Sequence, residues 1–196
     1  MKSVVKRAKN ILISPKAEWL VIKDEPDSAG GIIYRYVMFL AMLPPLAVLV
    51  KSILSTNAAA ARSPMSYLVA TNALWYLMNI VNVLIAGAVT TAFVFNALSR
   101  GDAVRGFKLA AYSFTPLFIA GIVIVAPGMG WFIYVAILYS VYLLYLGTCT
   151  VVELPKGSAL WYATAMFTAS GIIIAVLNLL EYFLESFVAD KVFFTV

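Results

Sequence analysis

The side chains most able to do chemistry in this sequence are amides, phenols and hydroxyls, because the sequence contains no histidine. Histidine is the commonest general base and a frequent zinc ligand, so its absence removes the usual catalytic triads and most zinc sites. The single cysteine, Cys149, excludes both a disulfide framework and a thiolate metal cluster within one chain. We therefore expect no catalytic residue, no metal and no cofactor, and a protein that is not an enzyme.

Two carboxylates near the C-terminus, Glu181 and Glu185, are the remaining candidates for binding a cation. Their spacing of four residues places them on one face of a helix. A calcium site needs six or more oxygen ligands, which two carboxylates do not supply alone. We favour a solvated helix end over a cation site.

Three asparagines, Asn72, Asn79 and Asn82, lie within the long uncharged stretch 65–98. At about 100° per residue, they fall together with Thr90 in a sector about 80° wide. Hydrogen bonding between membrane helices is the simpler interpretation of this stripe. A path for a polar solute is the alternative.

A second stripe, of phenols, occurs in residues 131–152. Tyr134, Tyr142 and Tyr145 share a sector of similar width with Cys149. Phenols deep in a membrane need hydrogen-bond partners, and amides or backbone groups freed by proline can supply them. This stripe and the asparagine stripe together suggest a channel or carrier as the alternative function.

The elements that position these side chains are membrane helices. Of the 196 residues, 63% are hydrophobic and 12% charged, whereas soluble domains carry about 25% charged residues. The expected fold class is an all-α integral membrane protein, with a five-helix transmembrane domain at 32–196. Its expected spans, each long enough to cross about 30 Å of hydrocarbon, are residues 32–54, 65–98, 109–126, 131–152 and 159–185.

Residues 1–31 precede the first span, and we expect short amphipathic helices there on the cytoplasmic side. Residues 2–13 place apolar side chains on one face and lysines roughly opposite, which is typical of a helix lying on an anionic leaflet. Alternatively, these lysines only direct the topology of the chain in the membrane, and the segment does not lie on the leaflet. Ser14 as N-cap and Pro15 predict the start of a second helix, with Trp19 as an interfacial anchor.

Basic residues predict the orientation, because they are enriched in cytoplasmic loops. Five spans place eleven lysines and arginines on the N-terminal side, with Arg105 and Lys108 in the loop before the third span. The eleven are Lys2, Lys6, Arg7, Lys9, Lys16, Lys23, Arg35, Arg100, Arg105, Lys108 and Lys156, and the three on the other side are Lys51, Arg62 and Lys191. We expect a cytoplasmic N-terminus and an external C-terminus.

Prolines interrupt two of the expected spans. The pair at 44–45 predicts a kink in the outer half of the first span. In the third span, around which we expect the others to pack, Pro116 frees the backbone carbonyl of Tyr112. The hydroxyls of Ser113 and Thr115 can repair this break by bonding to nearby backbone. Tyr112 is then either a packing residue or a contact for a partner.

Four short motifs follow one another along the chain. They are SPKAEW at 14–19 with Glu25-Pro26 after it, AYSFTP at 111–116, YLLYLG at 142–147 and LPKGSA at 154–159. Together they resemble the prokaryotic branch of the Yip family, the Ypt/Rab-interacting proteins. The candidate partner or packing residues in these motifs are Ser14, Pro15, Trp19, Glu25, Pro26, Tyr112, Ser113, Pro116, Tyr142, Tyr145, Gly147, Pro155 and Lys156.

The resemblance implies five transmembrane helices with a cytoplasmic N-terminus, in the inner membrane of a prokaryotic cell. Eukaryotic relatives contact Rab GTPases and partner Yip proteins and influence membrane shape. We therefore expect a non-catalytic membrane scaffold or adaptor that acts through its cytoplasmic face. Its expected partners are the anionic inner leaflet, an unidentified membrane or cytoplasmic protein and a second copy of the chain, and nucleic acid is not expected. A continuous wet cavity would favour the channel or carrier instead.

Overall fold

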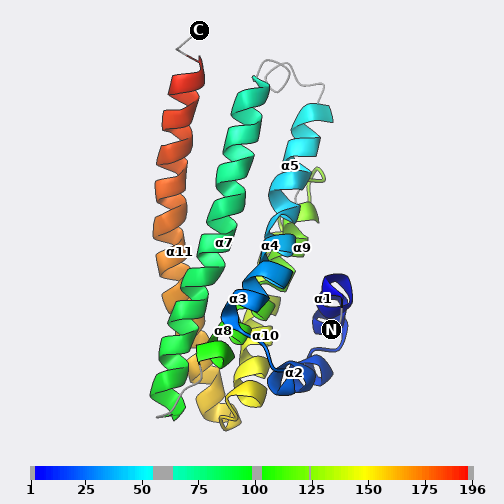
Figure 1. Cartoon of the computed structure of the whole chain (residues 1–196), viewed down its shortest axis with the longest axis vertical. Helices are drawn as coiled ribbons and strands as arrows, with labels where there is room; N and C mark the ends of the chain where they lie inside the picture. The colour runs from blue at the N-terminus through cyan, green and yellow to red at the C-terminus, as the bar shows by residue number, and fades with distance from the viewer. Residues whose placement is uncertain (1–2, 55–63, 99–102, 124, 194–196) are drawn as a thin grey trace.

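The computed structural model describes residues 3–54, 64–98, 103–123 and 125–193, and within these residues every regular element is a helix. Figure 1 shows long helices standing side by side, with two short helices packed against the lower half of the bundle. The helices are α1 (Val4–Ile13), α2 (Pro15–Asp24), α3 (Ala29–Ile32), the π-helix η1 (Ile33–Val37), α4 (Met38–Ala41), α5 (Leu43–Leu54), α7 (Met65–Leu98), α8 (Ala103–Ser113), α9 (Thr115–Val123), α10 (Phe132–Val151) and α11 (Lys156–Phe193).

Five helical segments of the described chain are long and apolar enough to cross a membrane. This confirms the expected all-α membrane fold. The segments are Ala29–Leu54, Met65–Ala97, Ala103–Val123, Phe132–Val151 and Lys156–Leu184.

The first span is broken at Met42, between α4 and α5. The two prolines that follow lack backbone donors and so cannot continue the helix ladder. The break lies near the middle of the span rather than in its outer half, where we predicted the kink. Pro44 packs directly on α9 at Gly121, and this approach is possible because glycine has no side chain there.

The third span is the centre of the bundle, as predicted. In the most hydrophobic 18-residue stretch of this span, 72% of the residues are buried, whereas only 17% are buried in the corresponding stretch of the span formed by α11. The span begins at Ala103, earlier than we predicted, so Arg105 and Lys108 lie on a helix rather than in a loop. The backbones of α7 and α8 approach closely because Gly106 lies against Thr91 and Gly87 faces Phe107.

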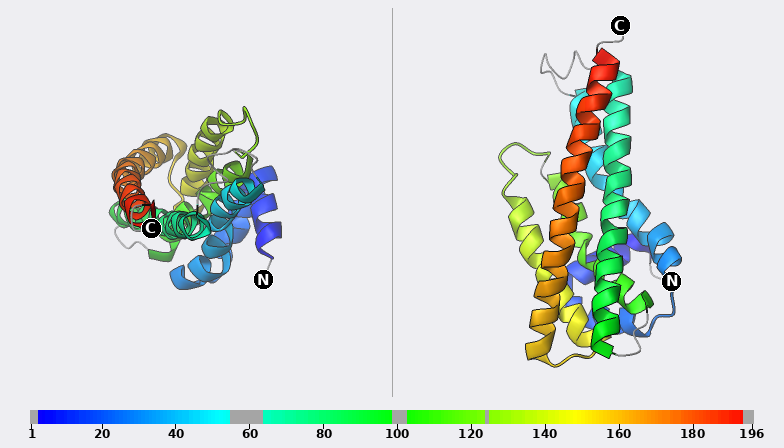
Figure 2. Two further views of the ribbon diagram at one scale, coloured as in Figure 1. Left: turned by 90° about the horizontal axis from the view of Figure 1, so that it is seen from above. Right: turned by 90° about the vertical axis from the view of Figure 1, so that its left-hand side faces the viewer.

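Helices α7 and α11 are the longest, with 34 and 38 residues. They run side by side and extend beyond the connection between α9 and α10 (Figure 2). Helix α11 continues without a break through Glu181, whose side chain is only 8% exposed. The predicted solvated end at Glu181 is therefore wrong, and the side chain of Glu185 lies outside the described residues.

The described N-terminal helices lie at the same end of the bundle as the start of α11, and the far end of α11 lies at the opposite end (Figure 1). This arrangement follows from an odd number of spans. The motifs of the N-terminal segment, the third span and the α10–α11 connection consequently meet at one end of the molecule.

Candidate functional site

Helix α1 has the amphipathic pattern that we predicted, but its buried face packs on protein. Ala8 and Ile11 are buried among α2 and the transmembrane helices, whereas Lys6 and Lys9 are exposed. The hydroxyl of Tyr139 on α10 donates a hydrogen bond to the carbonyl oxygen of Leu12 at 2.6 Å. The buried face of α1 is therefore not available to the leaflet, which corrects our expectation.

Trp19 on α2 is fully buried rather than an interfacial anchor. Its ring lies against α10 at Gly147, where a β-carbon would stand 2.8 Å from the ring atom Cζ2. Ser14 is the N-cap residue and Pro15 begins α2, as predicted, but the hydroxyl of Ser14 does not make the capping hydrogen bond that we expected. Two motifs distant in sequence, SPKAEW and YLLYLG, thus fit together through one indole and one glycine.

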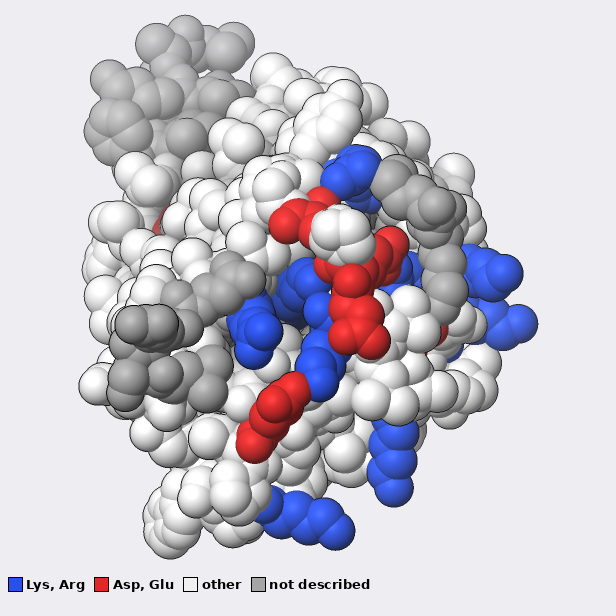
Figure 3. Space-filling view, turned by 60° about the horizontal axis from the view of Figure 1, so that its bottom comes forward, with Lys and Arg blue, Asp and Glu red and all other residues white. Residues whose placement is uncertain are grey.

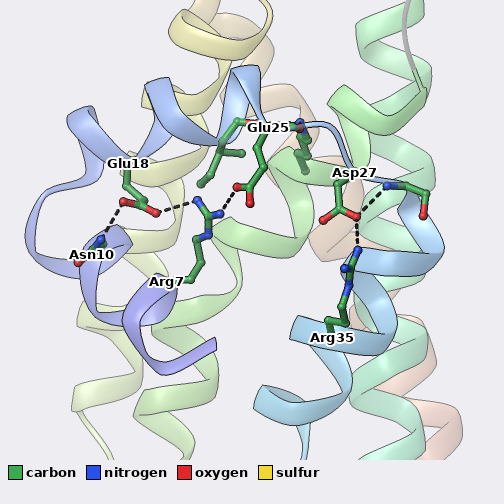
Figure 4. A network of polar contacts seen from close by, with 9 residues as sticks. Arg7, Asn10, Glu18, Glu25, Asp27 and Arg35 are labelled. Atoms are coloured by element: carbon green, nitrogen blue, oxygen red, sulfur yellow. Dashed lines mark hydrogen bonds and ion pairs between the residues drawn. The ribbon is translucent and has the colours of Figure 1, made fainter. Parts of the chain in front are cut away.

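Arg7 forms the centre of a buried ionic cluster between α1 and α2 (Figure 4). Its Nη1 donates to Oε1 of Glu18 at 2.7 Å, and its Nη2 pairs with Glu25. Asn10 donates to the second oxygen of Glu18 at 3.0 Å. Arg7 is 5% exposed and Glu18 3%, so the carboxylate and the guanidinium are both removed from solvent. This cluster holds the two helices as one hairpin.

Lys108 on α8 joins this hairpin to the transmembrane bundle. Its buried ammonium group donates hydrogen bonds to the carbonyl oxygens of Ile22 and Glu25, both at 2.7 Å. These carbonyls lie at the C-terminal end of α2, where helix carbonyls lack intrahelical partners and the helix dipole is negative. A lysine here satisfies both the hydrogen bonds and the charge.

The ring of Tyr112 lies beneath the hairpin and contacts three other side chains. The Arg7 guanidinium carbon is 5.7 Å from its centroid, and the ring centroids of Trp19 and Tyr36 are 6.2 and 4.8 Å away. Edge-on aromatic pairs and a cation over a ring face are favourable geometries. Tyr112 thus connects α1, α2, the first span and the third span.

The helix break at Pro116 is repaired as predicted, by Thr115. The Thr115 hydroxyl donates to the carbonyl oxygen of Tyr112 at 2.7 Å. The Tyr36 hydroxyl lies 2.7 Å from the Thr115 oxygen and must be the donor there, because Thr115 has only one proton to give. Ser113 takes no part in this repair.

A second ion pair lies beside the Arg7 cluster (Figure 4). Asp27 accepts a hydrogen bond from Nη2 of Arg35 at 2.7 Å, and the hydroxyl of Ser28 caps the start of α3. A cavity of about 50 Å³ between the two groups has room for a few water molecules. It is lined by Val4, Arg7, Glu25, Asp27, Gly31, Ile32, Arg35, Tyr36 and Tyr112.

The α10–α11 connection is tied to α2 by an ion pair between Lys23 and Glu153. The hydrogen bond from Lys23, together with its charge, holds the pKa of Glu153 below its ordinary value. Glu153 has a φ of 62°, a left-handed conformation that is uncommon outside glycine. Pro155 and Lys156 are exposed beside it. Figure 3 shows acidic side chains gathered in a band at this end, with basic ones on both sides.

The predicted polar stripes do not join this site. Asn72 and Asn79 donate to carbonyls of their own helix, those of Leu68 and Trp75, at 2.8 and 3.0 Å. Asn82 reaches Asn178 on α11 at 3.3 Å, and Thr90, in the same sector, donates to the carbonyl oxygen of Gly106 on α8 at 2.7 Å, so these two members of the stripe make interhelical hydrogen bonds.

The tyrosine stripe has no common partner either. Tyr142 is exposed and its ring stacks on Tyr139, at 5.7 Å between centroids. Tyr145 lies beside Cys149, one turn along its own helix. Of the YLLYLG motif, Gly147 makes the close contact with Trp19 of the hairpin.

Several residues of the site were absent from the sequence-based candidates, among them Arg7, Glu18, Tyr36 and Lys108. One signal was available, because Arg7 lies three residues after Val4 and four before Ile11, on the apolar face of α1. A charge on an apolar face indicates a buried partner. Glu18 also lies inside the SPKAEW motif. Nothing local to Tyr36 or Lys108 indicates their contacts.

A family model described as the Yip1 domain matches residues 9–177 of the chain. The match includes Glu18, Glu25, Lys108 and Tyr112, and it begins just after Arg7. No curated protein and no solved structure matches the chain.

Proposed function

Because the chain belongs to the Yip1 domain family, we propose that it is a non-catalytic membrane scaffold that presents its docked N-terminal hairpin, residues 4–24, to a protein partner. One observation carries this proposal: the hairpin is held on the bundle by a buried network rather than left free at the bilayer. A surface that is fixed in this way is preorganised, which lowers the entropic cost of binding. We propose that this surface faces the cytoplasm, because lysine and arginine are concentrated at this end of the chain's spans. We also propose that the membrane is the inner membrane of a prokaryotic cell, on the resemblance of its motifs to the prokaryotic branch of the family.

The composition of the network supports a role in positioning. Replacing a buried ion pair with apolar residues is often neutral or stabilising, so such a pair is weak evidence for stability. Arg7 and Glu18 of the hairpin and Lys108 of α8 instead define one docking geometry, because Arg7 joins α1 to α2 and Lys108 joins the end of α2 to the bundle. The network therefore supports a rigid adaptor surface.

The outer surface of the hairpin combines apolar and basic groups. Exposed lysines attract an anionic leaflet, and exposed aliphatic side chains favour the interfacial region of a membrane or a partner helix. These exposed residues are Val5, Lys6, Lys9, Ile13, Lys16, Leu20 and Val21. We propose that the partner is a membrane-associated protein that contacts this surface at the inner leaflet.

Site-specific photocrosslinking in cells tests the proposal. A photoreactive amino acid at Leu20, which is exposed on α2, should give a discrete crosslink to a protein. The same group at Val176, exposed on α11, is the matched control and should react mainly with lipid.

The Arg7→Met variant should weaken the crosslink at Leu20, because the hairpin would lose the ion pairs that hold α1 to α2 and the cation contact with the ring of Tyr112 on the third span. The adaptor proposal would be contradicted if the group at Leu20 gave the same crosslinked products as the group at Val176. It would also be contradicted if Arg7→Met left the protein crosslink at Leu20 unchanged.

A further inference from the structure

A cavity of about 160 Å³ lies inside the bundle, on the opposite side of α8 from the close contacts of the hairpin. It forms where α7, the α8–α9 junction, α10 and α11 meet, and small residues such as Ala86, Ala110 and Gly171 leave the space open. Three serines line it, and each belongs to a different helix: Ser113 on α8, Ser140 on α10 and Ser170 on α11.

Two of these serines have hydroxyl groups without a partner. Ser113 and Ser140 are only 4% and 3% exposed, and neither hydroxyl makes a hydrogen bond in the described structure. Hydroxyls in membrane helices ordinarily bond to a carbonyl one turn back, as Thr148 and Thr150 do at 2.8 and 2.9 Å. An unsatisfied hydroxyl in hydrocarbon is costly, so each unpartnered group needs an explanation.

Apart from Thr90, whose hydroxyl donates to the carbonyl oxygen of Gly106 at 2.7 Å, the rest of the lining is apolar. Phe114, Leu117, Leu144 and Phe167 surround the three serines, and no charged side chain borders the cavity. An ion or a strongly polar solute would therefore lose hydration without compensation. A neutral, mainly apolar molecule with one or two polar atoms would suit this lining.

We propose that this cavity binds a small uncharged molecule that carries a hydroxyl or carbonyl group, with Ser113 and Ser140 as its hydrogen-bond partners. The size fits, because an apolar cavity of about 150 Å³ is known to accept benzene. Gly171 is exposed at the edge of the cavity, so the molecule enters sideways from the bilayer. This site is separate from the hairpin surface and does not depend on the adaptor proposal.

Photolabelling of the purified full chain in detergent micelles tests the proposal, with a diazirine derivative of octanol as the probe. Labelling of the peptides that line the cavity should saturate, and unlabelled octanol should compete while octane competes weakly. Ser140→Ala should reduce saturable labelling roughly three- to tenfold, the range expected for one hydrogen bond in a membrane protein. The variant should fold normally, because it removes a hydroxyl that has no protein partner.

Two further variants separate occupancy from loss of fold. Gly171→Leu should abolish labelling by filling the mouth of the cavity, and its backbone accepts a side chain, since no atom lies within 4 Å of the added β-carbon. Thr168→Ala, at an exposed position on the same helix, should label like the unmodified protein. The proposal would be overturned if labelling does not saturate or if unlabelled octanol does not compete with the probe. It would also be overturned if Ser140→Ala and Gly171→Leu are labelled as strongly as the unmodified protein. The cavity would then hold only water or lipid.

Discussion

At the scale of single residues, the ammonium group of Lys108 connects the third span to the N-terminal hairpin. It lies in an apolar helix and satisfies two carbonyl oxygens at the end of α2. A buried lysine is tolerated only when its donors are satisfied, and the end of a helix offers acceptors and negative partial charge together. The contact therefore depends on both elements being in place.

The Lys108→Met variant should destabilise the protein by about 2 kcal/mol, because the carbonyls of Ile22 and Glu25 lose their charged donor in a buried setting. Thermal unfolding in detergent measures this loss. Lys156→Met is the matched control, since Lys156 is exposed, and it should melt like the unmodified protein. An unchanged melting temperature for Lys108→Met would contradict the role assigned to this ammonium group.

Tyr112 acts mainly through its ring, which contacts Arg7, Trp19 and Tyr36. Tyr112→Phe keeps these contacts and should change the free energy of unfolding by less than about 1 kcal/mol. Tyr112→Ala removes them and should cost about 3 kcal/mol or more. Melting curves of the two variants measure the difference, and equal losses would show that the hydroxyl rather than the ring is essential. A lost protein crosslink in a stable Tyr112→Phe variant would instead assign the hydroxyl to partner binding.

At the scale of elements, the α1–α2 hairpin is a unit that the Arg7 cluster holds together. Arg7→Met leaves the carboxylates of Glu18 and Glu25 without their guanidinium, and Glu18 is buried. Breaking a buried ion pair by removing one partner costs about 3–5 kcal/mol. We expect the hairpin to detach and the chain near Ser14 to become sensitive to protease.

A second variant distinguishes loss of charge balance from loss of packing. Adding Glu18→Gln and Glu25→Gln to Arg7→Met removes the unpaired carboxylates and should recover part of the protease resistance. Proteolysis time courses of the three proteins measure this. If the triple variant is cleaved as fast as Arg7→Met, the arginine stabilises the hairpin by packing alone.

The α10–α11 connection should respond to pH through Glu153. Its pairing with Lys23 lowers the pKa of Glu153 from the ordinary value of 4.5, so the stabilisation is complete above that pH and is lost as the pH falls through the lowered pKa. Glu153→Gln should therefore melt slightly below the unmodified protein at pH 7. The two melting temperatures should converge well below pH 4.5, and a difference that persists unchanged there would contradict the ion pair.

At the scale of the whole molecule, five spans and one basic end predict a single orientation. A reporter fused after Val196 should be external, and one inserted at Gly101 should be cytoplasmic, because eleven of the lysines and arginines belong to the N-terminal side. Enzyme reporters that are active on only one side of the membrane measure this. The opposite result at either site would contradict five crossings or the assigned direction.

The sequence alone determined the properties that depend on local composition. Length and apolarity identify five spans, because the hydrophobic thickness of a bilayer sets the length of a helix that crosses it. The proline break and its repair by Thr115 were also predictable, since the bonded groups lie three residues apart. The motifs indicated the family, which the Yip1 domain match over residues 9–177 shows.

Only the tertiary structure decided what covers each apolar face. The pattern of α1 indicates an apolar face but does not distinguish lipid from protein as its partner, so the docking of Ala8, Ile11 and Trp19 on the bundle could not be predicted. Lys108 and Ile22 are 86 positions apart, and no local signal relates them. The serine-lined cavity likewise exists only where four spans meet, because each span contributes side chains whose neighbours depend on how all of them pack.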